Sequence, residues 1–196
     1  MSAIFAMGCA AGLIVAFFTI AQRRALRNGQ RMTVCDPVSW VIAGCCVGVA
    51  GYAGTAAAAI VLAACAVGAA SDRQTGYLFD AVAAGAGGLL CIGAVVGGEL
   101  PTLALGAGSC GGVLWVLHLT TRGRGVGLGD VKLAALIGGG LGVRIGAIAV
   151  GAAFVAGAIV AVGGLVSGRV SRGDSVDFGP YLAIGSMLGV ALAGGI

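Results

Sequence analysis

The sequence predicts an all-α protein, a polytopic bundle of about eight transmembrane helices. Of its 196 residues, 59% are hydrophobic and 9% are charged, and the mean hydropathy is +1.09. A soluble domain carries about 25% charged residues, so this chain lacks the side chains to cover a water-facing surface. The long apolar runs show no alternation typical of membrane β-strands. The 39 glycines lie among aliphatic residues, which predicts close helix–helix packing in a single unit over residues 1–196.

Each predicted helix is an apolar run between polar clusters. A membrane span needs about 20 apolar residues, or fewer where protein or water shields its ends. The first run, from Ser2 to Ala21, has no charged residues before it, which predicts a membrane helix rather than a cleaved signal peptide. The second and sixth runs are the shortest. The predicted segments are 2–21, 38–53, 55–71, 78–97, 101–119, 131–143, 145–167 and 179–196.

The connections between these segments predict the orientation of the chain. With the N-terminus outside, ten of the eleven Lys and Arg residues fall on the inner face, and only Arg144 lies outside. Basic residues favour cytoplasmic loops, so we expect both termini outside and a short basic cytoplasmic loop at 22–37. The ten are Arg23, Arg24, Arg27, Arg31, Arg73, Arg122, Arg124, Lys132, Arg169 and Arg172.

Neither a metal nor a cofactor is expected. The seven cysteines include no Cys-x-x-Cys pair, and His118 is the sole histidine, so a zinc site lacks ligands at suitable spacing. His118 is expected to pack or to anchor at the membrane interface, and no Ser/His/Asp set forms around it. The basic cluster from Arg23 to Arg31 is a topology signal that also meets anionic membrane lipid. We expect no nucleic acid as a partner.

Two aspartates at the inner ends of predicted helices are the candidates for chemistry. Asp130 ends Gly127-Leu128-Gly129-Asp130 at the start of the sixth segment, and Asp72 stands at the end of the third. A carboxylate at a membrane boundary is a functional-site hypothesis by default. An N-cap would also explain Asp130, because a helix N-terminus favours an anion. The same dipole repels Asp72 at a C-terminal end, so capping of its own helix does not explain it; pairing with Arg73 or capping of the next helix are the structural alternatives.

The glycines beside these acids have expected roles of their own. Those before Asp130 are expected to adopt unusual backbone dihedrals and to let another chain approach. Gly138-Gly139-Gly140 is expected to interrupt the sixth helix and make it mobile. Asp80 follows Asp72 by eight positions and is expected to cap the fourth helix or to pair with Arg73.

Two carboxylates held close together support acid–base catalysis. One keeps a proton near neutral pH while the other acts as a base. The base takes a proton from water, the water attacks a carbonyl, and the acid protonates the oxyanion and then the leaving amine. This is peptide hydrolysis without a metal, a nucleophilic side chain or a cofactor.

Three stretches of the chain resemble the type IV prepilin peptidases, which are intramembrane aspartyl proteases of the GxGD class. Gly127-Leu128-Gly129-Asp130-Val131-Lys132-Leu133 is similar to the family's GxGDxKL element. Asp72 with Asp80 is similar to its earlier aspartate pair, although Phe79 stands where the family often has proline. The third stretch, 178–185, reads Phe-Gly-Pro-Tyr-Leu-Ala-Ile-Gly and resembles its late FGPxLALG-like element.

The resemblance implies roles for particular residues. Asp72 and Asp130 would be the catalytic pair, Gly127 and Gly129 would shape the loop beside the scissile bond, and Lys132 would bias the pair's protonation. Asp80, Gly179 and Pro180 would support the motifs. The implied substrate is the short basic leader of a prepilin or pseudopilin, cut at the cytoplasmic face of a prokaryotic cell membrane just before the hydrophobic stretch.

One departure from the family narrows the expected activity. Longer members carry a zinc-binding cytoplasmic domain after the first helix and also methylate the new N-terminus. Here that region is the loop 22–37, with Cys35 as its single cysteine. We therefore expect a peptidase without methyl transfer, similar to the short form of the family.

Three alternatives remain, one of which is a purely structural membrane subunit. A protease similar to signal peptide peptidase or presenilin would share GxGD but would place its first aspartate in a Tyr-Asp element within a helix. A small transporter or channel would use the acids as a proton relay. It would need carboxylates near the bilayer midplane, whereas the acids here lie at predicted helix ends.

Overall fold

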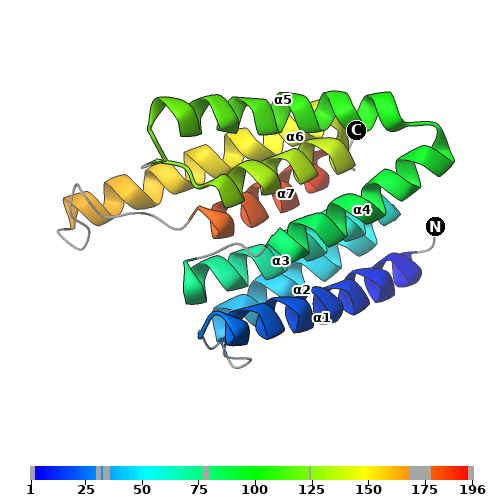
Figure 1. Ribbon diagram of the computed structural model, residues 1–196, viewed down its shortest axis with the longest axis horizontal. Helices are drawn as coiled ribbons and strands as arrows, with labels where there is room; N and C mark the ends of the chain where they lie inside the picture. Colours follow the sequence, from blue (N-terminus) through cyan, green and yellow to red (C-terminus); the bar gives the residue numbers. More distant parts are fainter. Residues whose placement is uncertain are drawn as a thin grey trace.

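A computed structural model describes residues 3–29, 32, 36–76, 80–123, 125–167 and 178–193. Within these ranges all regular secondary structure is helical, which confirms the predicted all-α class. Five helices, α1 and α3–α6, are long and apolar enough to cross a membrane, and α2 and α7 are shorter apolar helices. The elements are α1 Ala3–Arg27, α2 Pro37–Ala53, α3 Ala56–Thr75, α4 Asp80–Gly97, α5 Leu100–Thr120, α6 Leu128–Val166 and α7 Gly179–Ala193 (Figure 1).

The part of the chain that the structure describes has seven helical elements and not the predicted eight, because the sixth and seventh predicted segments are joined in the single element α6. That element is broken at one residue, Gly142, whose φ of 81° and ψ of 165° are not helical. A Cβ on Gly146 would lie 2.8 Å from Cα of Gly138. A straight helix would separate these residues by about 12 Å. The chain therefore turns back at Gly142, and α6 consists of a first and a second arm (Figure 1).

Helix α3 is the centre of the bundle. It packs against α1, α2, α4, α6 and α7. Its apolar stretch is 72% buried, whereas those of the other four long helices are at most 28% buried. Its side chains are mostly alanine and valine, so neighbouring helices approach it closely on every side. The other long helices direct aliphatic side chains outward, as expected for helices that face lipid. Asp72 thus lies on the central helix, in its last turn.

The helix ends separate the charges. We call the end where α3 and α5 finish and where α4, α6 and α7 begin the site end; Gly142 and Glu99 mark the far end. Figure 1 shows that α1 begins and α7 finishes at the far end. Of the seven Lys and Arg residues that the structure describes, only Arg144 lies near the far end. The other four, Arg31, Arg124, Arg169 and Arg172, lie outside the described residues.

The connection between α1 and α2 is shorter than the predicted loop 22–37, since α1 continues to Arg27. Asp36 ends this connection as the N-cap of α2 and accepts hydrogen bonds from the backbone N–H and the hydroxyl of Ser39. It also pairs with Arg73 across 3.8 Å, which ties α2 to the end of α3. The Ser39 hydroxyl and the Arg73 guanidinium hold the pKa of Asp36 below its usual value. Cys35 lies outside the described residues.

Glycines form the packing contact between α5 and the first arm of α6. The backbones of Gly106 and Gly138 press against each other, so a Cβ on either residue would collide with the other's carbonyl oxygen. Gly138, Gly139 and Gly140 are all helical, and a Cβ on Gly140 would meet Val61 and Leu90. The expected interruption of the helix at this triplet is therefore wrong. These glycines are packing residues, and the break comes two positions later, at Gly142.

Gly138→Ala is expected to destabilise the bundle. The new methyl group would collide with the Gly106 carbonyl oxygen and would lie 2.8 Å from Cβ of Cys110. Overpacking of this kind costs about 1–3 kcal/mol, which corresponds to a fall of roughly 5 °C in the melting temperature for a chain of this size. Thermal unfolding in detergent, followed by circular dichroism, measures the change. Gly108→Ala is the matched control, because a Cβ on Gly108 meets nothing within 4 Å. Equal melting temperatures for the two variants would contradict the packing role.

Candidate active site

A cavity of about 290 Å³ at the site end brings together residues from α3, α4 and α6. Both aspartates of the predicted pair line it, although they are far apart in the sequence. Every other predicted site residue except Gly179 and Pro180 also lines it. Its lining residues are Asp72, Gly76, Asp80, Gly127, Leu128, Gly129, Asp130 and Lys132.

Asp72 is held by a helix other than its own. It is half-buried in the last turn of α3, and its Oδ2 accepts a 2.9 Å hydrogen bond from the backbone N–H of Gly179. Gly179 is the first residue of α7. The free N–H groups and the positive dipole end of α7 therefore stabilise a negative charge that the C-terminus of α3 would repel. This contact explains why an aspartate is tolerated at the end of a central membrane helix.

The sequence around Gly179 fits this contact. A Cβ on Gly179 would lie 2.9 Å from Oδ2 and 3.0 Å from Cβ of Asp72, so glycine alone leaves room for the carboxylate. Pro180 is the next residue of α7, where a helix has no need of a backbone N–H donor. Phe178 precedes them and packs its ring 4.9 Å from that of Phe154 on the second arm of α6. The late motif at residues 178–185 thus holds Asp72 in position through Gly179, at the start of α7.

Asp130 occupies the first turn of α6. Its Oδ2 accepts a 3.1 Å hydrogen bond from the backbone N–H of Gly127, and Gly127 is the N-cap. Asp130 is therefore the third helical residue rather than the cap itself. It is half-buried. As with Asp72, its carboxylate lies at the positive end of a helix dipole.

The glycines of this loop do not adopt the unusual dihedrals expected for them. Gly127 has φ −75° and ψ 156°, which any residue can adopt, and Gly129 is helical. Among the described residues of the connection between α5 and α6, Arg122, with φ 52°, and Gly123, with φ 75°, are left-handed. The tight turn thus comes before the motif. Gly127 and Gly129 line the cavity, and neither has a side chain that would fill it.

Asp80 pairs with Lys132 and not with Arg73, so the pairing that was expected as one of its two roles is wrong. Lys132 Nζ on α6 lies 2.5 Å from Oδ1 of Asp80 at the start of α4, while Arg73 pairs with Asp36. The side chains of Lys132 and Asp80 are 45% and 78% exposed, so water screens their pairing and little stability follows from it. The consequence is geometric, because this ion pair links α4 to α6 at the edge of the cavity.

His118 is hydrogen-bonded to the loop that precedes Gly127. Its Nδ1 lies 2.7 Å from the carbonyl oxygen of Val126, which can only accept, so Nδ1 carries the proton. The ring also lies against Gly123, and Val126 is buried. The sequence indicated a packing role for His118 but gave no sign of this bond. Its partner is a backbone carbonyl eight residues away, and nothing in the sequence identifies a backbone partner.

No family model, no curated protein and no solved structure matches the chain in comparisons with known proteins. The resemblance to prepilin peptidases therefore rests on the three sequence stretches alone. In the structure, residues from all three meet around Asp72 and Asp130.

The arrangement has the groups for acid–base chemistry on a bound peptide. Two half-buried carboxylates face one cavity, each beside a backbone N–H at a helix start. Within the described residues, no three His, Cys, Asp or Glu side chains come together as a metal-binding group. Carboxyl groups in such an arrangement can take up and give up protons.

His118→Ala is expected to slow any reaction at this cavity, because the loop before Gly127 loses its anchor. His118→Asn is expected to retain most activity, since its side-chain N–H can replace Nδ1–H. His118→Gln, whose amide lies one carbon farther out, is the matched comparison. The measurement is the initial cleavage rate of the three variants at equal membrane levels. Equal loss in His118→Asn and His118→Ala would show that ring packing matters and the hydrogen bond does not.

Proposed function

We propose that this chain is an intramembrane aspartyl endopeptidase that removes the short basic leader of a prepilin or pseudopilin. The observation that carries the proposal is the shared cavity of Asp72 and Asp130, with Gly179 bound to Asp72. These residues were selected from separate motifs in the sequence. Their convergence on one cavity supports a common role.

In this proposal the two carboxyl groups share the proton transfers of hydrolysis. The ionised one takes a proton from a water molecule, whose oxygen then adds to the scissile carbonyl carbon. The protonated one gives its proton to the developing oxyanion. Collapse of the tetrahedral intermediate returns the carbonyl and breaks the C–N bond, and the amine leaves with a proton from a carboxyl group. Gly127 and Gly129 leave space beside Asp130 for the substrate backbone.

The position of the cavity fits a cut at a membrane surface. Six of the seven described Lys and Arg residues lie at the site end, which would face the cytoplasm by the charge rule. Asp80 also lines the cavity and is 78% exposed, so it is available to a basic leader. The proposed activity does not include methyl transfer, because the connection between α1 and α2 is too short for the domain that carries it in the longer prepilin peptidases.

A proton-relay transporter is the alternative from another class. A relay needs ionisable groups along the path across the membrane. Among the described residues, the acids of the cavity lie at the site end, and Glu99 lies at the far end. The buried core between them is apolar apart from Ser71 and Ser186. The peptidase is therefore the better-supported function.

The test is cleavage by the purified protein in lipid vesicles. The substrate carries a short basic leader, a glycine at the cut and about 20 apolar residues after it. We expect a gel shift and a mature product with an unmethylated N-terminus by mass spectrometry, both unchanged by EDTA. Vesicles without the protein are the control. An intact substrate would refute the peptidase, loss of activity in EDTA would refute a metal-free mechanism, and a methylated product would refute the restriction to peptidase activity.

A further inference from the structure

A hollow of about 460 Å³ lies between α4, α5 and the first arm of α6. Most of its surface comes from small or aliphatic side chains, and only Asp80 and Lys132 are charged. Its lining residues are Asp80, Ala83, Ala84, Gly87, Leu90, Cys91, Leu103, Ala107, Lys132, Ala135, Leu136 and Gly139.

A second hollow of about 410 Å³ adjoins it toward the far end. Leu90, Leu103 and Gly139 line both hollows. The second hollow reaches Glu99 and Thr102, which lie at the connection between α4 and α5. We call these two adjoining hollows together the α4 groove.

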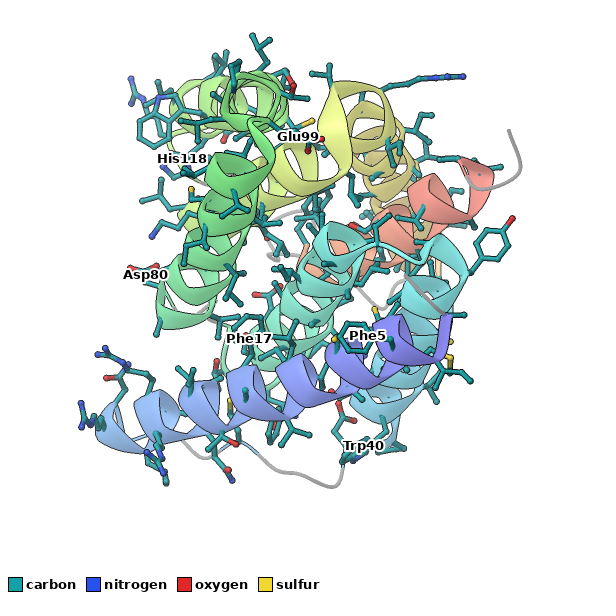
Figure 2. The ribbon with its side chains drawn as sticks, turned by 90° about the vertical axis from the view of Figure 1, so that its right-hand side faces the viewer. Phe5, Phe17, Trp40, Asp80, Glu99 and His118 are labelled. Carbon is teal, nitrogen blue, oxygen red and sulfur yellow. The ribbon has the colours of Figure 1, made fainter. Side chains whose placement is uncertain are left out.

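The α4 groove opens at the candidate active site. Asp80 and Lys132 line both the groove and the catalytic cavity, so the two spaces meet at this ion pair. Figure 2 shows Asp80 and Glu99 at opposite ends of α4. The groove is therefore polar at each end and apolar between them, which is the pattern of a segment that crosses a membrane.

We propose that the α4 groove binds the apolar helix of the substrate, the segment that directly follows the scissile bond. This inference rests on the proposed function. Along α4 the lining extends over residues 80–94, which is about 21 Å at the helical rise. A helix of that length covers about two thirds of the hydrocarbon core. A peptide whose cut bond lies in the cavity can continue past Asp80 and Lys132 into the groove, because both residues line both spaces.

The lining favours a helix over a lipid chain. Ala84, Gly87 and Ala107 are small, so the backbone of a second helix can approach closely, as in membrane helix pairs. A lipid covers one leaflet, whereas this groove extends from one charged end of α4 to the other. Its two polar ends match a helix that begins beside the cut at one membrane surface and finishes near the other.

Disulfide trapping tests the position of the substrate helix. Cys91 is exposed and lines the groove about 16 Å along α4 from Asp80. In the inactive Asp130→Asn background, a substrate with one cysteine about eleven residues after the cut is expected to cross-link under oxidation. Cys45 is a matched control, since it is also exposed and α2 contacts neither α4 nor α5. The cross-link should disappear in Cys91→Ala and persist in Cys45→Ala. Its absence, or its survival in Cys91→Ala, would overturn the groove.

Filling the groove gives a second and independent measurement. Gly87 lines the groove and Gly88 lines neither hollow, so Gly87→Leu and Gly88→Leu form a pair on one helix. We expect Gly87→Leu to slow cleavage about tenfold and Gly88→Leu to leave it unchanged. Equal rates in both would overturn the groove while the peptidase stands. If the wild type cleaves no substrate, the proposed function fails first, and the groove loses its occupant with it.

Discussion

Asparagine at Asp72 or at Asp130 is expected to remove nearly all cleavage and to leave a small residual rate. The amide has nearly the shape of the carboxylate and can still accept the N–H of Gly179 or Gly127 through its oxygen. It can neither take a proton from water nor give one to the leaving amine. General acid–base catalysis contributes about 10²–10⁴-fold, so the loss of either partner should lower the rate by about a thousandfold. The gel-shift assay at equal membrane levels measures this loss for each variant.

A further acid-to-amide change is the control for this result. Asp36→Asn alters an acid at the α1–α2 connection, outside both the cavity and the α4 groove. It is expected to cleave at close to the wild-type rate. Cleavage at close to the wild-type rate in Asp72→Asn or Asp130→Asn would exclude that residue from the pair. Loss in all three variants would indicate a general effect of charge rather than a catalytic pair.

The extent of most helices followed from the sequence because apolar runs end at polar clusters. The predicted segments 38–53 and 78–97 correspond closely to α2 and α4. The error came from α6, where a single residue with left-handed φ reverses the chain and the backbone remains helical on both sides. The sequence predicted the break between the sixth and seventh segments at Arg144, because that residue is charged, whereas the backbone turns at Gly142. Because the chain has 39 glycines, the sequence alone did not identify the glycine at which the backbone reverses.

The candidate site was predicted as a set of residues but not as a set of contacts. Asp72 and Asp130 were expected to meet because both stood at inner helix ends, and they line one cavity. The partners of the other charges were not predictable in the same way. Asp80 pairs with Lys132, although Arg73 is nearer to it in the sequence. The packing of α4 beside α6 decides which basic side chain is within reach.

Gly179→Ala is expected to lower cleavage about a hundredfold with little change in the amount of folded protein. The added Cβ would lie 2.9 Å from Oδ2 and 3.0 Å from Cβ of Asp72, closer than such atoms approach one another. Either the carboxylate or the start of α7 must move, and a misplacement of about 1 Å in a catalytic group can cost that much. Initial rates in vesicles, with protein levels matched by immunoblot, measure the change.

The control for Gly179→Ala is a glycine-to-alanine substitution at another position, where the new methyl group contacts nothing. Gly151→Ala on the second arm of α6 provides it, because a Cβ there meets nothing within 4 Å. It is expected to cleave like the wild type. The double variant Gly179→Ala with Asp72→Asn separates two explanations. If the methyl group acts by displacing Asp72, it should reduce the residual rate of Asp72→Asn no further. A further loss would mean that Gly179 acts on the reaction through another group, and the role of α7 in holding Asp72 would have to be abandoned.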